Sequence, residues 1–178
     1  MRAFAVVMFT AGALIGCVVY PTQRTYFEPN AMDGVPTPSR SCGYHNTRND
    51  ALIRDVNGLH VQVSPRLNEG KPVSVTVLFR AASIPDVSPE RYELRSVTTG
   101  ATFLPVSHKV TAYKPDKTHP YNSSWVTLQF QPVPEQLSEI AIVFPPGSVS
   151  LNGRVVELAP FRFHKTTKSD VYYGSINC

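Results

Sequence analysis

Short segments in which apolar and polar residues alternate follow one another along most of the chain. They cover residues 59–63, 73–80, 91–97, 101–107, 109–113, 125–133, 139–144 and 161–165, and turn-forming residues separate them. Because successive side chains of a β-strand point to opposite faces, this alternation predicts strands with one buried face. Asn152-Gly153, between two apolar arms in residues 149–158, predicts a hairpin.

The alternation also predicts which side chains form the core. One buried face is expected at Val73, Val75, Val77 and Phe79, a second at Val126, Leu128 and Phe130, and a third at Phe161 and Phe163. Trp125 falls on the opposite side of its strand. Arg162 and His164 likewise alternate with the two phenylalanines, on the outer side.

Strands and turns in this rhythm predict an all-β fold. We expect an immunoglobulin-like β-sandwich of about seven to nine short, mostly antiparallel strands. The 178 residues suit one domain, and 16 prolines disfavour long helices. The domain is expected over residues 42–178.

The chain begins with a different pattern. Arg2 is followed by an apolar run that ends in small residues at Gly16. This is the layout of a secretory signal peptide over residues 1–16. The run is shorter than the roughly 20 residues of a spanning helix, although an uncleaved anchor extended through Tyr20 stays an alternative.

Leu14-Ile15-Gly16-Cys17 resembles the lipobox of bacterial lipoprotein precursors. The resemblance covers the leader only. It implies cleavage between Gly16 and Cys17, a diacylglycerol thioether on Cys17 and acylation of its new amine, for example by palmitate. Val18 stands where aspartate is linked with inner-membrane retention, so the resemblance implies the outer membrane, with the domain facing the periplasm.

Residues 17–41 are expected to form a semi-extended linker. Four prolines, at positions 21, 29, 36 and 38, interrupt this segment, and no periodicity is sustained in it. The alternative is that part of it, around Tyr26-Phe27, packs along the domain as an additional edge strand.

Cys42 and Cys178 remain when Cys17 is assigned to lipid. An even pair in an oxidising compartment predicts a disulfide, with an intermolecular bridge or free thiols as alternatives. His45 follows Cys42 closely, but a catalytic cysteine needs its base nearby in space rather than in sequence. We therefore expect no catalytic role for this cysteine.

Charge and motifs exclude several functions. The formal net charge is +4 and the cations are scattered, whereas a nucleic-acid partner would require a concentrated basic stripe. The five histidines form no pair at metal-ligand spacing, although His108 and His119 could meet across a hairpin. The sequence predicts no metal, no cofactor and no catalytic residues.

The segment 108–125 is the best candidate for a partner surface. It combines cations with aromatic residues around two prolines: Lys109, Tyr113, Lys114, Lys117, Tyr121 and Trp125. Such a mixture is favoured in recognition surfaces, and lysines suit an anionic partner. A solvated hairpin loop without a partner is the plainer alternative.

The prediction is therefore a non-catalytic, lipid-anchored binding or scaffolding lipoprotein. Its partner is expected to be an envelope protein or an anionic envelope polymer. Two alternatives stay open: a ligand- or metal-binding module that uses the 108–125 loop with His164, and an envelope hydrolase whose site forms only in three dimensions.

Overall fold

The computed structural model describes residues 18–39, 46–67, 70–131 and 137–174. This part of the chain is all-β, apart from two single-turn 3-10 helices, η1 (Ala31–Asp33) and η2 (Pro89–Arg91). The strands are β1 (Val18–Pro29), β2 (Val35–Pro38), β3 (Asn49–Val56), β4 (Leu59–Arg66), β5 (Val73–Ala81), β6 (Asp86–Val87), β7 (Glu93–Ser96), β8 (Thr102–Phe103), β9 (Pro105–Tyr113), β10 (Asn122–Phe130), β11 (Glu139–Val143), β12 (Val149–Leu151), β13 (Arg154–Val155) and β14 (Phe161–Gly174).

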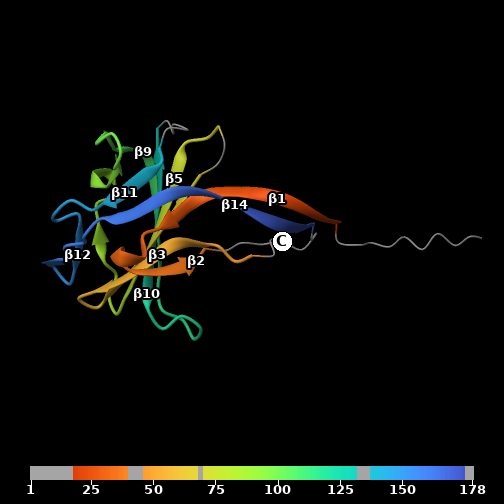
Figure 1. The fold of residues 1–178 in the computed structure, drawn as a ribbon. Coiled ribbons are helices and arrows are strands. Elements are labelled where there is room, and N and C mark those ends of the chain that lie inside the picture. The colour runs from red at the N-terminus through yellow and green to blue at the C-terminus, as the bar shows by residue number, and fades with distance from the viewer. Residues whose placement is uncertain (1–17, 40–45, 68–69, 132–136, 175–178) are drawn as a thin grey trace, which may run out of the picture.

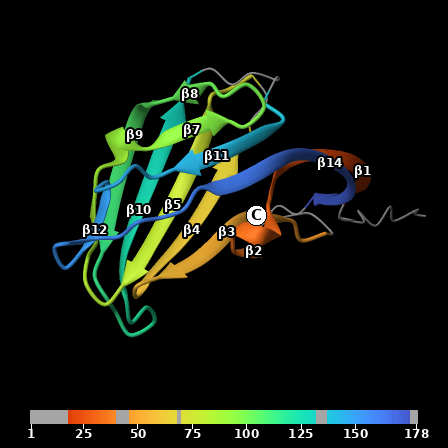
Figure 2. The ribbon, with the colours of Figure 1, turned by 60° about the vertical axis from the view of Figure 1, so that its left-hand side comes forward.

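The strands form three antiparallel sheets in a sandwich-like arrangement (Figure 1). One sheet has the order β2-β3-β4-β5-β10-β9, and the second has the order β1-β14-β11-β7-β8. A small third sheet, β13-β12-β6, closes one end. Figure 2 shows β7, β11 and β14 crossing in front of the six-stranded sheet, so the two large sheets are separate layers.

The core lies between these two layers, as the alternation predicts. Val73, Val75, Val77 and Phe79 are at most 1% exposed, as are Val126, Leu128 and Phe130. Phe161 and Phe163 meet them from β14. Trp125 faces outward, and 41% of its surface is exposed. The predicted inner and outer faces are therefore confirmed.

The number of strands exceeds the prediction. Fourteen strands are present in the described ranges, where about seven to nine were expected. Eight of them have five or more residues, and the others are pieces of two to four residues. Of these short pieces, β7, β8, β12 and β13 lie inside segments that the sequence predicts as strands or as a hairpin, whereas β2 and β6 do not.

The described part of the predicted linker lies within the sheets instead. β1 pairs with β14 over 12 positions, from Val18 opposite Gly174 to Pro29 opposite Phe163, and β2 pairs with β3. The alternative of an edge strand around Tyr26-Phe27 is therefore the arrangement that the structure has. The prolines are tolerated because β1 and β2 are both edge strands, where a missing N–H need not break a ladder.

Two Asn-Gly turns fix neighbouring strands in register. Asn152 and Gly153 both have positive φ, at 54° and 74°, which a type I′ hairpin requires. The predicted hairpin is thus confirmed between β12 and β13. Asn57 and Gly58 repeat the geometry between β3 and β4, with φ of 52° and 79°.

The β1–β14 ribbon is held to the sandwich by a buried ion pair. Arg24 Nη1 lies 2.7 Å from Asp170 Oδ2, and both side chains are about 5% exposed. Asn46 donates its backbone N–H and its Nδ2 to the other carboxylate oxygen, at 3.1 and 3.2 Å. The hydrogen bond from Arg24, together with those from backbone amides, lowers the pKa of Asp170 to about 2.

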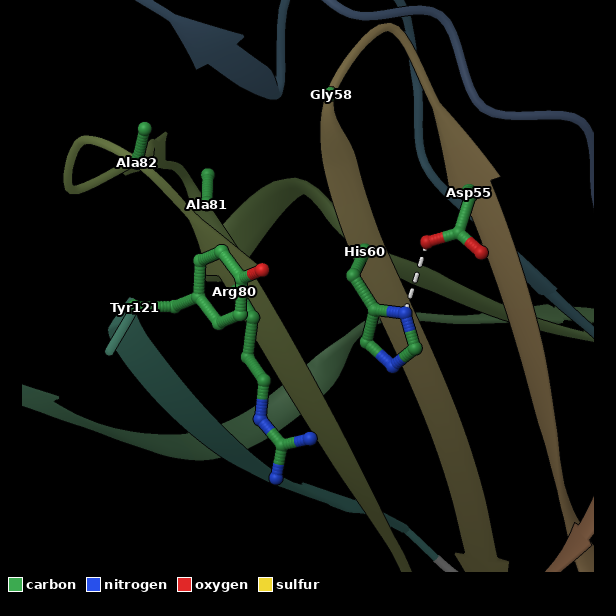
Figure 3. Close-up of a pocket in the computed structure, with 7 residues that line it drawn as sticks. All are labelled: Asp55, Gly58, His60, Arg80, Ala81, Ala82 and Tyr121. Atoms are coloured by element: carbon green, nitrogen blue, oxygen red, sulfur yellow. Dashed lines mark hydrogen bonds and ion pairs between the residues drawn. The ribbon is translucent and has the colours of Figure 1, made fainter. Parts of the chain in front are cut away.

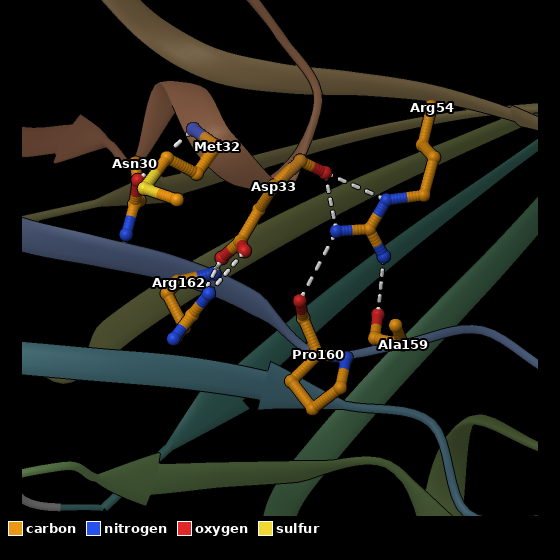
Figure 4. Close-up of polar contacts among 7 residues, drawn as sticks. All are labelled: Asn30, Met32, Asp33, Arg54, Ala159, Pro160 and Arg162. Atoms are coloured by element: carbon orange, nitrogen blue, oxygen red, sulfur yellow. Dashed lines mark hydrogen bonds and ion pairs between the residues drawn. The ribbon is translucent and has the colours of Figure 1, made fainter.

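A second polar cluster ties η1 to β3 and β14 (Figure 4). Arg162 Nε donates to Asp33 Oδ2 at 2.7 Å, and this hydrogen bond lowers the pKa of Asp33. Arg54 Nε donates to the backbone oxygen of Asp33 at 2.7 Å, and its Nη2 donates to that of Pro160 at 3.2 Å. The Arg54 guanidinium also lies 4.1 Å from the centre of the Phe161 ring. One arginine therefore joins three segments over the core.

These two carboxylates predict a loss of stability in acid. The pKa values of Asp33 and Asp170 are lower in the folded protein than the usual 3.9 of the unfolded chain. Their contribution is therefore complete above about pH 4 and is lost as the pH falls toward 2. Urea unfolding at pH 6, 4 and 2.5 should show a falling midpoint in the parent and a smaller fall in Asp170→Asn. Parallel falls in the two proteins would contradict the role of Asp170.

The leader and all three cysteines lie outside the described residues. The predictions for Cys17, Cys42 and Cys178 therefore stay predictions, as does cleavage after Gly16. In the described part of the chain, no helix has the length and apolar character needed to cross a bilayer.

Candidate functional site

The candidate site is the solvent-facing side of the six-stranded sheet, which we call the outer face. Strand register places its side chains in cross-strand rows. The first row, from β9 to β3, is Tyr113, Ser123, Arg80, His60 and Asp55. The second row is Thr111, Trp125, Leu78, Gln62 and Ile53. Residues opposite one another on one face have Cβ atoms about 4.5–5.5 Å apart, so each row is a line of neighbouring side chains.

Three adjoining hollows follow these rows. The first, the Arg80 pocket, has a volume of about 450 Å³ and is lined by Asp55, Gly58, His60, Arg80, Ala81, Ala82 and Tyr121. The second, of about 350 Å³, shares Arg80 and Tyr121 with it and adds Tyr113, Lys114 and Trp125. The third, of about 500 Å³, shares Tyr113 and Trp125 with the second and continues over Gln62, Thr76 and Leu78. Because each hollow shares lining residues with the next, the three form a row along the outer face, which we call the groove.

The Arg80 pocket holds an oriented imidazole and an unpaired guanidinium (Figure 3). His60 Nδ1 lies 2.8 Å from Asp55 Oδ1. Since a carboxylate only accepts, Nδ1 carries the proton and Nε2 remains available to a ligand. No hydrogen bond or ion pair joins the Arg80 side chain to another residue in the described ranges. The N–H groups of the Arg80 guanidinium are therefore available to a ligand in this pocket.

The loop between β9 and β10 is ordered around Asp116. Its Oδ1 accepts hydrogen bonds from the Thr118 hydroxyl at 2.7 Å and from the backbone N–H groups of Thr118 and His119, at 2.7 and 2.8 Å. These hydrogen bonds lower the pKa of Asp116 to about 2, and the bond from the Thr118 hydroxyl has the largest effect. Oδ1 of Asp116 is thus engaged within the turn, whereas the Lys114 side chain in the same hollow is not paired with any described residue.

The structure gathers most of the surface residues that the sequence singled out. Tyr113, Lys114, Tyr121 and Trp125 line one hollow. Lys109 lies farther along the same face, opposite Thr127. Lys117 is exposed in the loop and is not in the wall of that hollow.

Sequence reasoning missed the residues from β3, β4 and β5. Arg80, His60 and Asp55 reach the aromatic residues only because five strands pair in one register. A local signal was available for two of them. Asn57-Gly58 predicts a hairpin, and a hairpin with a two-residue turn places Asp55 opposite His60.

The histidines do not assemble as a metal site in the part of the chain that the structure describes. No group of three or more His, Cys, Asp or Glu side chains comes together there. His108 lies opposite Leu128 in β9, away from the turn that holds His119. His164 belongs to β14 in the other sheet, with its Nε2 3.5 Å from Glu28, so it does not join the 108–125 segment.

The outer face offers cations, three exposed aromatic rings and a row of hydroxyl and amide groups that are half-buried or buried. Within the described residues, no hydroxyl or thiol is hydrogen-bonded to the free nitrogen of His60. Comparison of the chain with models of protein families, with curated proteins and with solved structures finds no match.

Proposed function

We propose that this protein is a non-catalytic, lipid-anchored binding lipoprotein of the bacterial outer membrane, with its domain facing the periplasm. Its partner, an envelope protein or an anionic envelope polymer, occupies the outer face. The observation that carries the binding role is the row of adjoining hollows, in which the unpaired Arg80 side chain adjoins exposed aromatic rings. Tyrosine, tryptophan and arginine are the residues most enriched where binding energy concentrates.

The position of β1 gives the proposed anchor a defined geometry. β1 begins at Val18, directly after Cys17, so a lipid on Cys17 would sit at the end of the β1–β14 ribbon. The rings of Tyr20 and Tyr172 are 5.2 Å apart close to that end. Tyrosine favours the membrane–water interface. The ribbon, rather than a flexible tether, would then set the distance between bilayer and domain.

A Cys17→Ser variant tests the anchor. The hydroxyl cannot take up the lipid, so the variant should remain an uncleaved precursor and leave the outer-membrane fraction. Mass spectrometry of the parent should find a lipid-modified N-terminus at Cys17. Cys42→Ser serves as the control and should keep both the lipid and the membrane fractionation. Processing of Cys17→Ser that matches the parent would remove the basis for the anchor and the location.

A variant of the outer face tests the binding role. Tyr113→Ser combined with Trp125→Ser removes two exposed rings from one hollow and touches no core residue. Crosslinking in native envelopes should then capture at least tenfold less partner, because such anchors typically contribute more than about 1 kcal/mol each. Val155→Ser removes an equally exposed apolar side chain from the small third sheet and should leave capture unchanged. Equal capture by both variants would contradict the proposed binding face.

Two alternatives make different predictions. A metal-binding module would melt at a higher temperature when Zn²⁺ is added to the purified protein. A hydrolase would require a nucleophile within reach of the Asp55–His60 pair, and it would lose all turnover in His60→Ala. The Asp55–His60 pair would supply a hydrolase with an oriented base. No nucleophile of the described residues is hydrogen-bonded to the free nitrogen of His60.

We also propose that the sandwich is immunoglobulin-like in outline. Two antiparallel sheets that enclose one core support this assignment. The long β1–β14 ribbon would be an addition to that outline. An experimental structure whose strand order differs from that of the immunoglobulin fold would refute this assignment.

A further inference from the structure

The guanidinium of Arg80 is a binding group that no described residue engages. It lies in the pocket wall with Tyr121 and His60 as neighbours (Figure 3). It is half-buried, and no described residue pairs with it. A guanidinium offers five donors in a planar fork, which matches the two oxygens of a carboxylate or phosphate. The unoccupied fork therefore points to an oxyanion as ligand.

The wall of the Arg80 pocket also contains small residues and an imidazole. At Gly58 an added Cβ would meet nothing within 4 Å, and Ala81 and Ala82 are the other small residues of the wall. His60 faces Arg80 across neighbouring strands and keeps Nε2 free, because Asp55 holds its Nδ1. An oxyanion on Arg80 could thus accept a further hydrogen bond when the imidazole is protonated.

An aromatic platform adjoins the pocket. Trp125 lies opposite Leu78, two residues from Arg80 on the same face of β5. This diagonal spacing is about 7–8 Å. Tyr113 and Tyr121 are 55% and 56% exposed beside it. Exposed rings with a polar tip contact the C–H face of a sugar ring well, because they combine an apolar surface with hydrogen-bonding groups at their edge.

Polar side chains lie beside this platform. Gln62 and Thr76 line the hollow on one side of Trp125, and Thr111 lies opposite it in β9. Hydroxyl and amide side chains can both donate and accept, so they match hydroxyls without fixed polarity. A purely apolar partner would leave these groups unsatisfied on binding, at a cost for each one.

We infer that the outer face binds an acidic saccharide, with a carboxylate or phosphate of the sugar on Arg80 and a sugar ring against Trp125. This inference rests on the proposed binding role and specifies its ligand. It places the anionic group and the ring at diagonal neighbours of the outer face, Arg80 and Trp125. Carboxylate and phosphate share the chemistry that Arg80 recognises, so experiment must decide between these two sources.

The chain contains a single tryptophan, Trp125, which makes its fluorescence a direct report on this face. Full-length protein purified from envelopes in detergent would be titrated with tetragalacturonate and with its neutral methyl ester. A phosphorylated mannose oligosaccharide and its dephosphorylated form make the second pair. We expect at least one acidic form to change the fluorescence and to bind about tenfold or more tightly than its neutral partner. The preferred acid identifies the source of the oxyanion.

Variants locate the contact. Arg80→Gln should weaken binding of the acidic sugar about ten- to hundredfold and leave that of the neutral form unchanged. Arg154→Gln removes the same charge from exposed β13 and should have no effect. Trp125→Ala, followed by calorimetry, should weaken both forms about tenfold. Unchanged melting temperatures would show that the variants fold.

Two outcomes would overturn the inference. One is equal affinity for acidic and neutral sugars together with an unaffected Arg80→Gln. The other is the absence of any sugar binding while envelope crosslinking still captures a protein through Tyr113 and Trp125. In the second case the proposed binding role would stand and only its ligand class would be wrong. If the variant that combines Tyr113→Ser with Trp125→Ser captured as much partner as the parent does, the binding role itself would be refuted.

Discussion

Replacing Phe161 with alanine is expected to lower the free energy of unfolding by about 3–5 kcal/mol. Phe161 is fully buried between the two large sheets. Its ring lies 5.6 Å from that of Phe144, and Arg54 stacks on it at 4.1 Å. Alanine would leave a cavity where these contacts were and would remove the surface on which Arg54 rests. Urea unfolding, monitored by tryptophan fluorescence and circular dichroism, measures the change in the free energy of unfolding.

A graded series separates the cavity from a general effect on β14. Phe161→Leu keeps part of the volume and should cost less than the alanine variant. Val155→Ala deletes an exposed apolar group and should stay within about 0.5 kcal/mol of the parent. A loss below about 1 kcal/mol in Phe161→Ala would contradict its position in the core.

The position of Phe161 shows which part of the fold can be predicted from the sequence. Alternation in 73–79, 126–130 and 161–163 reports burial directly, because one side of each strand must face apolar neighbours. The Asn152-Gly153 turn is equally local, since positive φ at both positions is a property of the residues themselves. Features set by neighbours in sequence were therefore predictable.

The β1–β14 ribbon shows what local patterns cannot give. Arg24 and Asp170 are 146 positions apart in the chain, and each alone is typical of an exposed position. Only their pairing allows both to be buried. The prolines of the N-terminal segment likewise suggested a linker. A sheet accepts proline only in edge strands, and that β1 and β2 are edge strands cannot be read from the segment itself. Edge position is a property of the whole sheet.

The candidate site divides in the same way. Tyr113, Lys114, Tyr121 and Trp125 come from one hairpin, so a single segment of sequence could identify them. Arg80 comes from another strand, and its place beside Tyr121 follows from the pairing of β5 with β10. The aromatic half of the groove could therefore be predicted from one segment, whereas the position of Arg80 could be predicted only from the strand order of the sheet.

Replacing both Cys42 and Cys178 with serine is expected to lower the free energy of unfolding by about 5 kcal/mol in the chain-entropy model, less any strain. The bridge stays a prediction, because both cysteines lie outside the described residues. Asn46, four residues after Cys42, bonds to Asp170, eight residues before Cys178. Four residues span at most about 13 Å and eight about 26 Å, so chain length alone does not prevent a bridge.

The loop that this bridge would close explains the size of the effect. It contains nearly the whole sandwich, and the entropy removed from the unfolded chain grows with the logarithm of loop length. The same bridge would hold the end of β14 against the β3 side of the sandwich, beside the Arg24–Asp170 pair. Reductant should therefore destabilise the parent and leave the double serine variant unchanged. Thiols at Cys42 and Cys178 that react fully in the native, unreduced protein would show that no bridge exists.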